Sequence, residues 1–575
     1  MGRQPIRGLH EVAVGLEVRA TGGVGTSRSP RSPTYASNYA GSIGCHPTGD
    51  AHRGVARVGV LLVSILLVIV ATDRSANAAP PPGPRLSSAA APPAPSISPD
   101  AVNWLSDRLV ELTFTNPVIN PPLAKTKVRI LVPAGYADSG KRYPMVLLLH
   151  GIGDTSSAWT KNQDGWPKTL ETFTAGKDVI VVMPDAGQNG DAGWYTDWYN
   201  NGAYGTPRWE TYHLVQLLDY VDRSFPTRGD RNGRVVAGLS MGGFGTMSYA
   251  ARHPDLFAGA FSFSGALDST NLVFTPEIWG LRATEEVRQR GHNPIDLADN
   301  LADTRVWFRT GMGLPGGPGP KDNTPGLEPA IWPTNERFAQ ALSASGVPYF
   351  YEAYPMGGHN WWHWQEGFQL AWPSMQKLFD AVIPPPATFR YRSVESPFRI
   401  WGWDVEARRS VVEFLQMRAV STEGLELEGS GLVLLTTPPA YEPGRSYNIE
   451  AKGPTAAVAP AVVVADAQGR LQFEVTLGPS HTQQQYTAAQ RAQAAADPRY
   501  WQAAKVHIAA APITVTPAEL AATPPTPTGD VRPLPRLPET GSLPFPEALP
   551  IALAAGYALL ASVNRRASRP RRPRS

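Results

Sequence analysis

The sequence has almost no cysteine. Its 575 residues contain only Cys45, and a single thiol cannot build a disulfide framework within one chain. The sequence also has no group of residues at metal-ligand spacing and no glycine-rich nucleotide loop. We therefore expect no disulfides, no metal and no cofactor.

The chain also has little excess charge of either sign. Its formal net charge is +3, and six arginines follow Asn564 at the C-terminal end. Without that tail the chain is close to neutral, so it lacks the basic surface that binds nucleic acid. We expect no nucleic-acid partner. The length is too great for one ordinary core and predicts two or more domains with tails.

The N-terminal part contains one apolar run, at residues 58–71, with two arginines before it. The small-residue sequence Ala-Asn-Ala follows at 76–78. This order is typical of a secretory signal cut by signal peptidase, and the run is short for a membrane span. We expect residues 1–78 to be an extension with a signal peptide; an uncleaved anchor is the alternative. Residues 79–100 are a Pro/Ala linker.

Residues 101–386 alternate short apolar segments with amphipathic ones. Apolar strands separated by helices predict an α/β domain whose mostly parallel sheet is covered on both faces. The expected strands are 127–132, 145–150, 178–183, 234–239, 259–264, 305–309 and 349–354, and the expected helices are 209–225, 241–253, 335–345 and 365–382.

Residues 387–515 have a different pattern, which is typical of short alternating strands with turns between them. We expect a small all-β, sandwich-like domain, with strands at 410–415, 432–436 and 471–477 and a helical insert at 482–506. A spacer role is the simpler reading of this domain, and a sugar- or wall-binding role is the alternative.

The C-terminal end has a three-part order. A Pro-rich linker at 516–536 precedes Leu-Pro-Glu-Thr-Gly, an apolar run at 550–563 and the basic tail. This order resembles the sorting signal of Gram-positive surface proteins, in which a sortase-type transpeptidase cuts between the positions of Thr540 and Gly541. We expect residues 537–575 to be such a signal; a plain C-terminal membrane anchor is the alternative.

The strongest local motif is Gly-Leu-Ser-Met-Gly at 238–242, with Ser240 at its centre. A β-branched strand is expected before it and a helix after it. A serine on such a strand–turn–helix is held on a strained turn, and the helix N-terminus favours a developing oxyanion. We expect Ser240 to be a nucleophile.

A serine nucleophile needs a base. The histidines downstream of Ser240 include His253, His292, His359 and His363. His359 lies in a loop just after the last expected strand, so we expect it to be the base, with His363 as the second choice.

The base needs an orienting acid, which in this fold lies between serine and histidine in the chain. The candidates are Asp322, Glu328 and Glu336, and spacing alone does not rank them.

Several further motifs resemble one family. They are LLLHG at 147–151, YTDWY at 195–199, RWET at 208–211, GLSMGG at 238–243 and HNWWHW at 359–364. From about residue 143 to residue 375 the chain looks like the esterase D group and its secreted mycolyltransferase relatives. The resemblance implies the α/β-hydrolase fold and a serine–histidine–acid triad.

The same resemblance implies the remaining catalytic parts. In the mycolyltransferases the acid is a glutamate about seven residues before an asparagine, and Glu328 precedes Asn335 by that spacing. This favours Glu328 over Asp322. The family's oxyanion hole corresponds here to the backbone N–H groups of Ile152 and Met241.

The chain departs from the mycolyltransferases at one place. They carry Asp-Gly-Leu-Arg where this chain has His-Gly-Ile-Gly at 150–153, so the two charges that help to bind trehalose are missing. We expect an aromatic and polar substrate wall instead, although simple loop packing is an equal alternative. Its candidate residues are His150, Tyr195, Asp197, Trp198 and Trp361.

These observations predict a secreted serine esterase, anchored to the cell wall or the outer face of the membrane, that hydrolyses an acylated carbohydrate or lipid. An acyltransferase that passes the acyl group to a sugar or glycerol hydroxyl is the first alternative. A catalytically inert wall-displayed binding protein is the second.

Overall fold

The computed structural model describes residues 96–119, 125–187, 192–203, 207–271, 276–316, 326–453, 456–459, 461–484 and 502–509. The expected signal peptide, the Pro-rich linkers and the sorting signal all lie outside these residues. Among the described helices, none is long and apolar enough to cross a membrane. The apolar runs at 58–71 and 550–563 lie outside the described residues.

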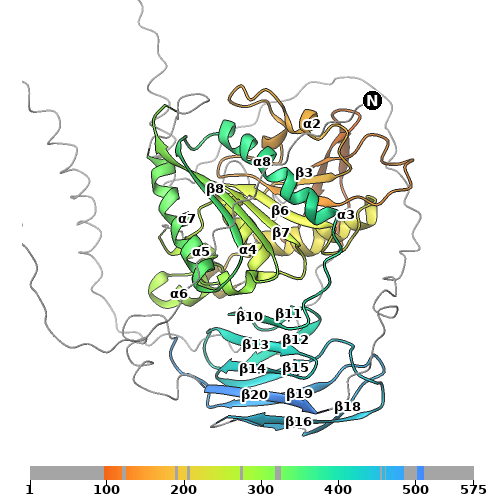
Figure 1. Ribbon diagram of the computed structural model, residues 1–575, viewed down its shortest axis with the longest axis vertical. Coiled ribbons are helices and arrows are strands. Elements are labelled where there is room, and N and C mark those ends of the chain that lie inside the picture. Colours follow the sequence, from red (N-terminus) through yellow and green to blue (C-terminus); the bar gives the residue numbers. More distant parts are fainter. Residues whose placement is uncertain are drawn as a thin grey trace, which may run out of the picture. The chain divides into compact units, whose positions relative to one another are not determined.

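One large mixed sheet organises the first part of the chain (Figure 1). Its order is β1-β2-β3-β5-β4-β6-β7-β8-β9. Strands β5, β4, β6, β7, β8 and β9 are parallel, whereas β1, β2 and β3 pair antiparallel at one side. The strands are β1 (Ala101–Trp104), β2 (Leu109–Thr115), β3 (Lys125–Leu131), β4 (Met145–Leu149), β5 (Ile180–Pro184), β6 (Arg234–Leu239), β7 (Gly259–Phe263), β8 (Arg305–Leu314) and β9 (Tyr349–Met356).

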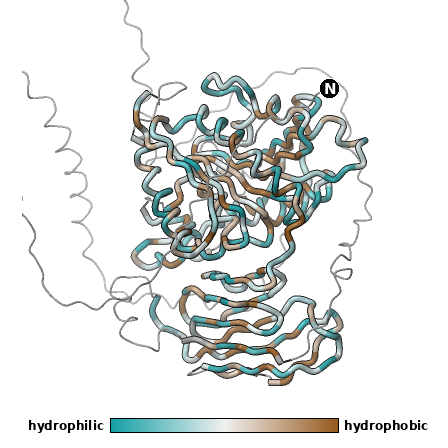
Figure 2. The backbone as a smooth tube through the Cα atoms, viewed as in Figure 1, coloured by the Kyte–Doolittle hydropathy of each residue, from teal (hydrophilic) through white to brown (hydrophobic). Residues whose placement is uncertain are grey.

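Both faces of this sheet are buried. In β4, Met145 and Leu147 belong to one apolar cluster, while Val146 and Leu148 belong to another. Because successive side chains of a strand point to opposite faces, the two clusters lie on the two sides of the sheet. Figure 2 shows the apolar residues concentrated in these central strands.

Helices cover the two faces. The cluster with Val146 includes residues of α2 (Leu170–Phe173) and α8 (Trp361–Phe379). The other cluster includes residues of α3 (Leu218–Ser224), α4 (Met241–Arg252) and α7 (Leu327–Ala344). The remaining helical segments are η1 (Ala158–Thr160), η2 (Asn200–Gly202), the π-helical η3 (Thr211–Leu217), η4 (Ser269–Asn271), α5 (Pro276–Trp279), α6 (Arg282–Arg290) and η5 (Ala298–Leu301).

Two antiparallel sheets form the second part of the described chain, which we call the β region. Their orders are β10-β13-β14-β20-β16-β18 and β11-β12-β15-β19-β17, and one apolar cluster contains residues of both. The strands are β10 (Phe389–Ser393), β11 (Phe398–Ile400), β12 (Trp403–Arg408), β13 (Leu415–Ser421), β14 (Gly424–Gly429), β15 (Gly431–Thr436), β16 (Ser446–Lys452), β17 (Ala457–Ala459), β18 (Val462–Val464), β19 (Gln472–Gly478) and β20 (Gln502–Ala509). The predicted fold class, a mostly parallel α/β sheet followed by an all-β region, is confirmed.

Two local predictions in the β region were wrong. The expected strand 410–415 is mostly a loop, because Val412 and Phe414 pack against the core of the α/β sheet instead of forming a ladder. The end of the expected helical insert, residues 502–506, belongs to strand β20. Its ladder pairs Leu427 with Ala504, both buried in the β core, so strand pairing overrides the local helical composition.

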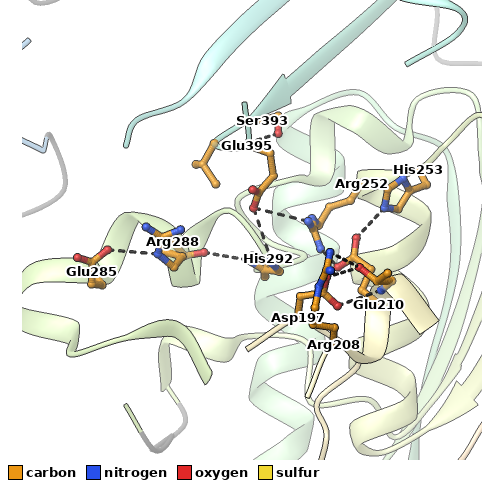
Figure 3. Close-up of polar contacts among 12 residues, drawn as sticks. Asp197, Arg208, Glu210, Arg252, His253, Glu285, Arg288, His292, Ser393 and Glu395 are labelled. Atoms are coloured by element: carbon orange, nitrogen blue, oxygen red, sulfur yellow. Dashed lines mark hydrogen bonds and ion pairs between the residues drawn. The ribbon is translucent and has the colours of Figure 1, made fainter. Parts of the chain in front are cut away.

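Hydrogen bonds join the β region to the helices of the α/β sheet. The Tyr391 hydroxyl donates to the carbonyl of Arg252 at 2.7 Å. The Asn300 side-chain amide donates to the Arg392 carbonyl and accepts a hydrogen bond from the Arg392 N–H. The Arg252 guanidinium also lies 3.6 Å from the Glu395 carboxylate, an ion pair drawn in Figure 3. The C-terminal end of α4 is therefore held by residues of the β region.

Candidate active site

Ser240 lies on a sharp turn between β6 and α4. It is the N-cap of α4, and its φ of 53° and ψ of −118° put a non-glycine residue in a strained conformation. The turn lifts the side chain beyond the carboxyl end of the sheet, and Ser240 remains partly exposed although both flanking elements are buried. A strained, accessible serine at this position has the geometry of a nucleophile.

The glycines on either side of Ser240 allow the turn to pack closely. A Cβ at Gly238 would lie 2.5 Å from the Gly242 carbonyl oxygen and 2.9 Å from the Leu149 side chain. A Cβ at Gly242 would lie 2.6 Å from the His150 carbonyl oxygen. The motif therefore needs glycine at both places because β4 passes directly beside the turn.

A chain of hydrogen bonds runs from Ser240 to a buried acid. His359 Nε2 lies 2.9 Å from Ser240 Oγ, and His359 Nδ1 lies 2.7 Å from Glu328 Oε2. His359 stands in the loop between β9 and α8, and Glu328 stands in the first turn of α7. The structure thus brings together the three residues predicted as nucleophile, base and acid.

The Glu328 side chain is fully buried and firmly held. Its Oε1 accepts hydrogen bonds from Ser264 Oγ at 2.7 Å, Thr310 Oγ1 at 3.0 Å and the Gly311 N–H at 2.6 Å. Three donors on one oxygen leave the other free to accept from His359 Nδ1. This arrangement favours the imidazole tautomer whose Nε2 is unprotonated and faces Ser240.

The loop after β4 contains Ile152, whose N–H is the second expected oxyanion donor. A Cβ at Gly151 would lie only 3.4 Å from the Ser240 Cβ, so this loop borders the nucleophile. His150 Nδ1 lies 2.8 Å from the Gly151 carbonyl oxygen and ties it back towards the core. Because the N–H and C=O of a trans peptide point in opposite directions, this contact turns the Ile152 N–H away from His150. Met241 begins α4, where backbone N–H groups are free.

Two of the predicted substrate residues are internal. His150 is buried, and its Nε2 accepts the Ala186 N–H at 2.9 Å, so both ring nitrogens are used within the protein. Burial also lowers the pKa of His150. The Tyr195 hydroxyl is buried and donates to the His150 carbonyl at 2.9 Å. The structure thus places both of these predicted substrate-binding side chains inside the protein, where they hold the loop beside Ser240.

The other expected wall residues are engaged in packing as well. Asp197 accepts from Thr211 and pairs with Arg208 at 3.3 Å (Figure 3). Trp198 donates to the Gly193 carbonyl at 3.0 Å. Trp361 is almost fully buried against other tryptophan rings. The alternative of loop packing therefore describes these residues better than a substrate wall does.

The remaining histidine candidates lie elsewhere. His363 is buried against the Tyr354 ring, and His253 contacts Glu210 at 2.7 Å. His292 lies near Arg252 (Figure 3), and burial lowers its pKa to about 4. None of the three is hydrogen-bonded to Ser240 within the described part of the chain. Asp322, the alternative acid, lies outside the described residues.

Sequence reasoning missed one charged residue beside the nucleophile. Asp154 follows the His-Gly-Ile-Gly segment, and its Oδ2 lies 3.6 Å from the point that a Gly151 Cβ would occupy. Burial raises its pKa to about 6, partly offset by Lys161, a backbone hydrogen bond from Gly151 and His359. The available sequence signal for this residue was a carboxyl directly after the His-Gly-Ile-Gly segment. It was missed because the comparison with Asp-Gly-Leu-Arg covers only residues 150–153.

Within the described residues, no group of three or more His, Cys, Asp or Glu side chains is arranged to hold a metal ion.

Known proteins match this part of the chain. Residues 122–374 match the family model described as a putative esterase. The esterase Rv1288 of Mycobacterium tuberculosis is 29% identical over 351 residues, covering 56% of this chain and 67% of the relative. The mycolyltransferase Ag85A of Mycobacterium leprae, a diacylglycerol acyltransferase, is 27% identical over 275 residues, covering 43% of this chain and 79% of the relative.

Solved structures are similar too. An S-formylglutathione hydrolase from Staphylococcus aureus has a TM-score of 0.37 and 23% identity, covering 46% of this chain and 98% of its own. MPT51 of Mycobacterium tuberculosis has a TM-score of 0.36 and 23% identity, covering 47% of this chain and 99% of its own. The family match and the two mycobacterial sequence relatives confirm the predicted α/β-hydrolase fold and the enzyme class, an ester hydrolase or acyltransferase.

Proposed function

We propose that the protein is a serine esterase that hydrolyses carboxylic esters through an acyl-enzyme on Ser240. The observation that carries this proposal is the hydrogen-bonded chain from Ser240 through His359 to Glu328. A serine hydroxyl is a weak nucleophile by itself, and an adjacent oriented base is what activates it.

Acylation follows from this geometry. Ser240 Oγ attacks the ester carbonyl carbon while His359 Nε2 takes the hydroxyl proton, and Glu328 stabilises the resulting imidazolium. The N–H groups of Met241 and Ile152 hold the negative oxygen of the tetrahedral intermediate. His359 then gives its proton to the leaving alkoxide, so an alcohol departs and the acyl group stays on Ser240.

Deacylation uses the same groups in reverse. Water gives a proton to His359 and attacks the acyl carbon, and collapse of the second intermediate returns the proton to Ser240 and releases a carboxylic acid. If an alcohol replaces water, the same steps transfer the acyl group. The similarity to Ag85A supports this acyltransferase alternative. A catalytically inert binding protein is the weaker alternative, because it has no use for a complete hydrogen-bonded triad.

A panel of short p-nitrophenyl esters tests the proposal. We expect the purified protein to release p-nitrophenol and to leave the free carboxylic acid as the main product. Glycerol or a sugar added as acceptor should then change neither the rate nor the product. A new ester of the acceptor would favour the acyltransferase, and a folded protein that turns over no ester in the panel would refute both.

We further propose that the protein is secreted and attached at the cell surface, as an acylated carbohydrate or lipid substrate would require. The signal-like segment in 1–78 and the sorting-like segment in 537–575 support this. Signal peptidase and a sortase-type transpeptidase acting between Thr540 and Gly541 would be its processing partners. In this proposal 101–386 is the catalytic domain, 387–515 the β-sandwich-like domain, and 79–100 and 516–536 are linkers.

Deletion of residues 537–575 tests the attachment. We expect the truncated protein to appear in the culture medium with its esterase activity intact, because the catalytic residues lie far upstream. The full-length protein should fractionate with the cell envelope. Envelope retention of the truncated form would contradict the sorting-signal proposal.

A further inference from the structure

Asp154 lies on the turn that borders the nucleophile. The Asp154 N–H donates to the Gly151 carbonyl at 3.3 Å, and Gly153 has a φ of 80°, as in a tight turn. The turn folds the Asp154 side chain back over Gly151. Asp154 Oδ2 and the Ser240 Cβ both lie within 3.6 Å of the point that a Gly151 Cβ would occupy, so the carboxylate and the nucleophile are near neighbours.

The Asp154 carboxylate has fewer partners than the buried carboxylates of Glu328 and Glu210. Glu328 accepts from three donors besides His359, and Glu210 pairs with Arg252. Within the described residues, no cationic side chain forms an ion pair with Asp154. Its only compensation is a backbone hydrogen bond from Gly151 and the more distant charges of Lys161 and His359.

An unpaired, partly buried carboxylate costs folding free energy. Burial raises the pKa of Asp154 to about 6, so above pH 7 the group is mostly ionised. Its negative charge then stands in a partly dry environment beside the reacting serine, where charges act more strongly than in bulk water.

We propose that Asp154 sets the charge preference of the active site. Its carboxylate favours esters that carry a cationic group near the scissile bond and disfavours esters that carry an anionic group there. This inference rests on the proposed esterase activity and adds a specificity-determining residue to it.

The expected size of the effect follows from Coulomb's law. At a separation of about 7 Å, with the screening of a partly buried site, one unit charge changes a rate constant by about tenfold. Asp154 also acts on the oxyanion and on the His359 imidazolium. Those effects are the same for every substrate, so they cancel in the ratio of the kcat/KM values of two differently charged esters.

Three acetate esters of similar shape provide the measurement. They are acetylcholine, the neutral 3,3-dimethylbutyl acetate and the anionic 2-sulfoethyl acetate. We expect kcat/KM at pH 8 and low salt to follow the order cationic, neutral, anionic. Asp154→Asn should lower the ratio of kcat/KM for the cationic ester to kcat/KM for the anionic ester by about tenfold or more. The variant should slow cleavage of the cationic ester and speed cleavage of the anionic one.

A second series places the charge on the acyl side. The p-nitrophenyl esters of 4-trimethylammoniobutyrate, butyrate and glutarate are compared in the same way. A shift of the ratio in either series supports the proposal and tells on which side of the scissile bond Asp154 lies. Ratios unchanged in both series would overturn it.

Controls separate this proposal from the proposed function. Asp178→Asn removes the same charge from an exposed residue before β5, at the opposite end of the strand from the carboxyl-end site, and should leave both ratios unchanged. Labelling of Ser240 by a fluorophosphonate shows that each variant is folded. If Asp154→Asn does not fold, Asp154→Ser replaces it in both series. If the wild type cleaves no ester at all, the proposed esterase function fails, whereas cleavage without charge preference defeats only the role of Asp154.

Discussion

Replacement of Ser240 by alanine should abolish ester turnover. The variant loses the atom that forms the acyl-enzyme, while alanine fits the turn between β6 and α4 without added bulk. We expect kcat to fall by about four to six orders of magnitude, to the level that substrate binding and the oxyanion donors alone provide. Hydrolysis of p-nitrophenyl acetate and labelling by a fluorophosphonate probe measure this directly.

A serine in the same domain gives the control. Ser343 lies on α7, where its exposed hydroxyl contacts the Tyr349 hydroxyl and is far along the helix from Glu328. Ser343→Ala should keep both turnover and labelling. Fluorophosphonate labelling that persists in folded Ser240→Ala would remove Ser240 as the nucleophile.

The second large effect is expected for Glu328→Gln. Because Oε1 accepts from Ser264, Thr310 and Gly311, the glutamine must place its carbonyl oxygen there. Its NH2 group then faces His359 Nδ1 and donates to it. The imidazole is forced to carry its proton on Nε2, the nitrogen that must accept the Ser240 proton.

This wrong tautomer should slow catalysis strongly, whereas the protein should remain folded. We expect kcat to fall by about three to four orders of magnitude with little change in the unfolding temperature. Steady-state kinetics beside thermal unfolding measure the two effects. Asp322→Asn, the same chemical change at the alternative acid, should leave kcat near that of the wild type. The reverse pattern would assign the acid to Asp322.

The nucleophile was predictable because its geometry is local. Gly238, Ser240 and Gly242 sit within one strand–turn–helix, and the residues that shape the turn are adjacent in sequence. The overall fold was predictable for a similar reason: the central strands are buried on both faces, so they read as continuous apolar runs. Strand β6 has the bounds that its sequence pattern predicts.

The acid was not predictable from spacing. Residues 305–309 were expected as a strand and 335–345 as a helix, but β8 extends to Leu314 and α7 begins at Leu327. These extensions bring Glu328 next to Thr310 and Gly311. Only the resemblance to known enzymes pointed to Glu328, because contacts between two element ends depend on tertiary packing.

The expected substrate wall shows a different limit of prediction from sequence. Aromatic residues in a loop after a strand have the same composition whether they face a ligand or pack inward. Tyr195 is fully buried and Trp361 nearly so, among other aromatic rings. The charge that does border the nucleophile, Asp154, is signalled in the sequence only by its position directly after the His-Gly-Ile-Gly segment. Burial of individual side chains in loops is decided by the surrounding fold.

The contacts at the end of α4 make the two sheets depend on each other. This helix carries Ser240 at its start and Arg252 at its last turn, where Glu395 and Tyr391 hold it from the β region. Phe414 also completes the apolar cluster of the α/β sheet. A catalytic fragment without the β region would keep every triad atom and still lose part of the support of its own nucleophile helix. Removal of the β region is therefore expected to destabilise α4 without removing a catalytic group.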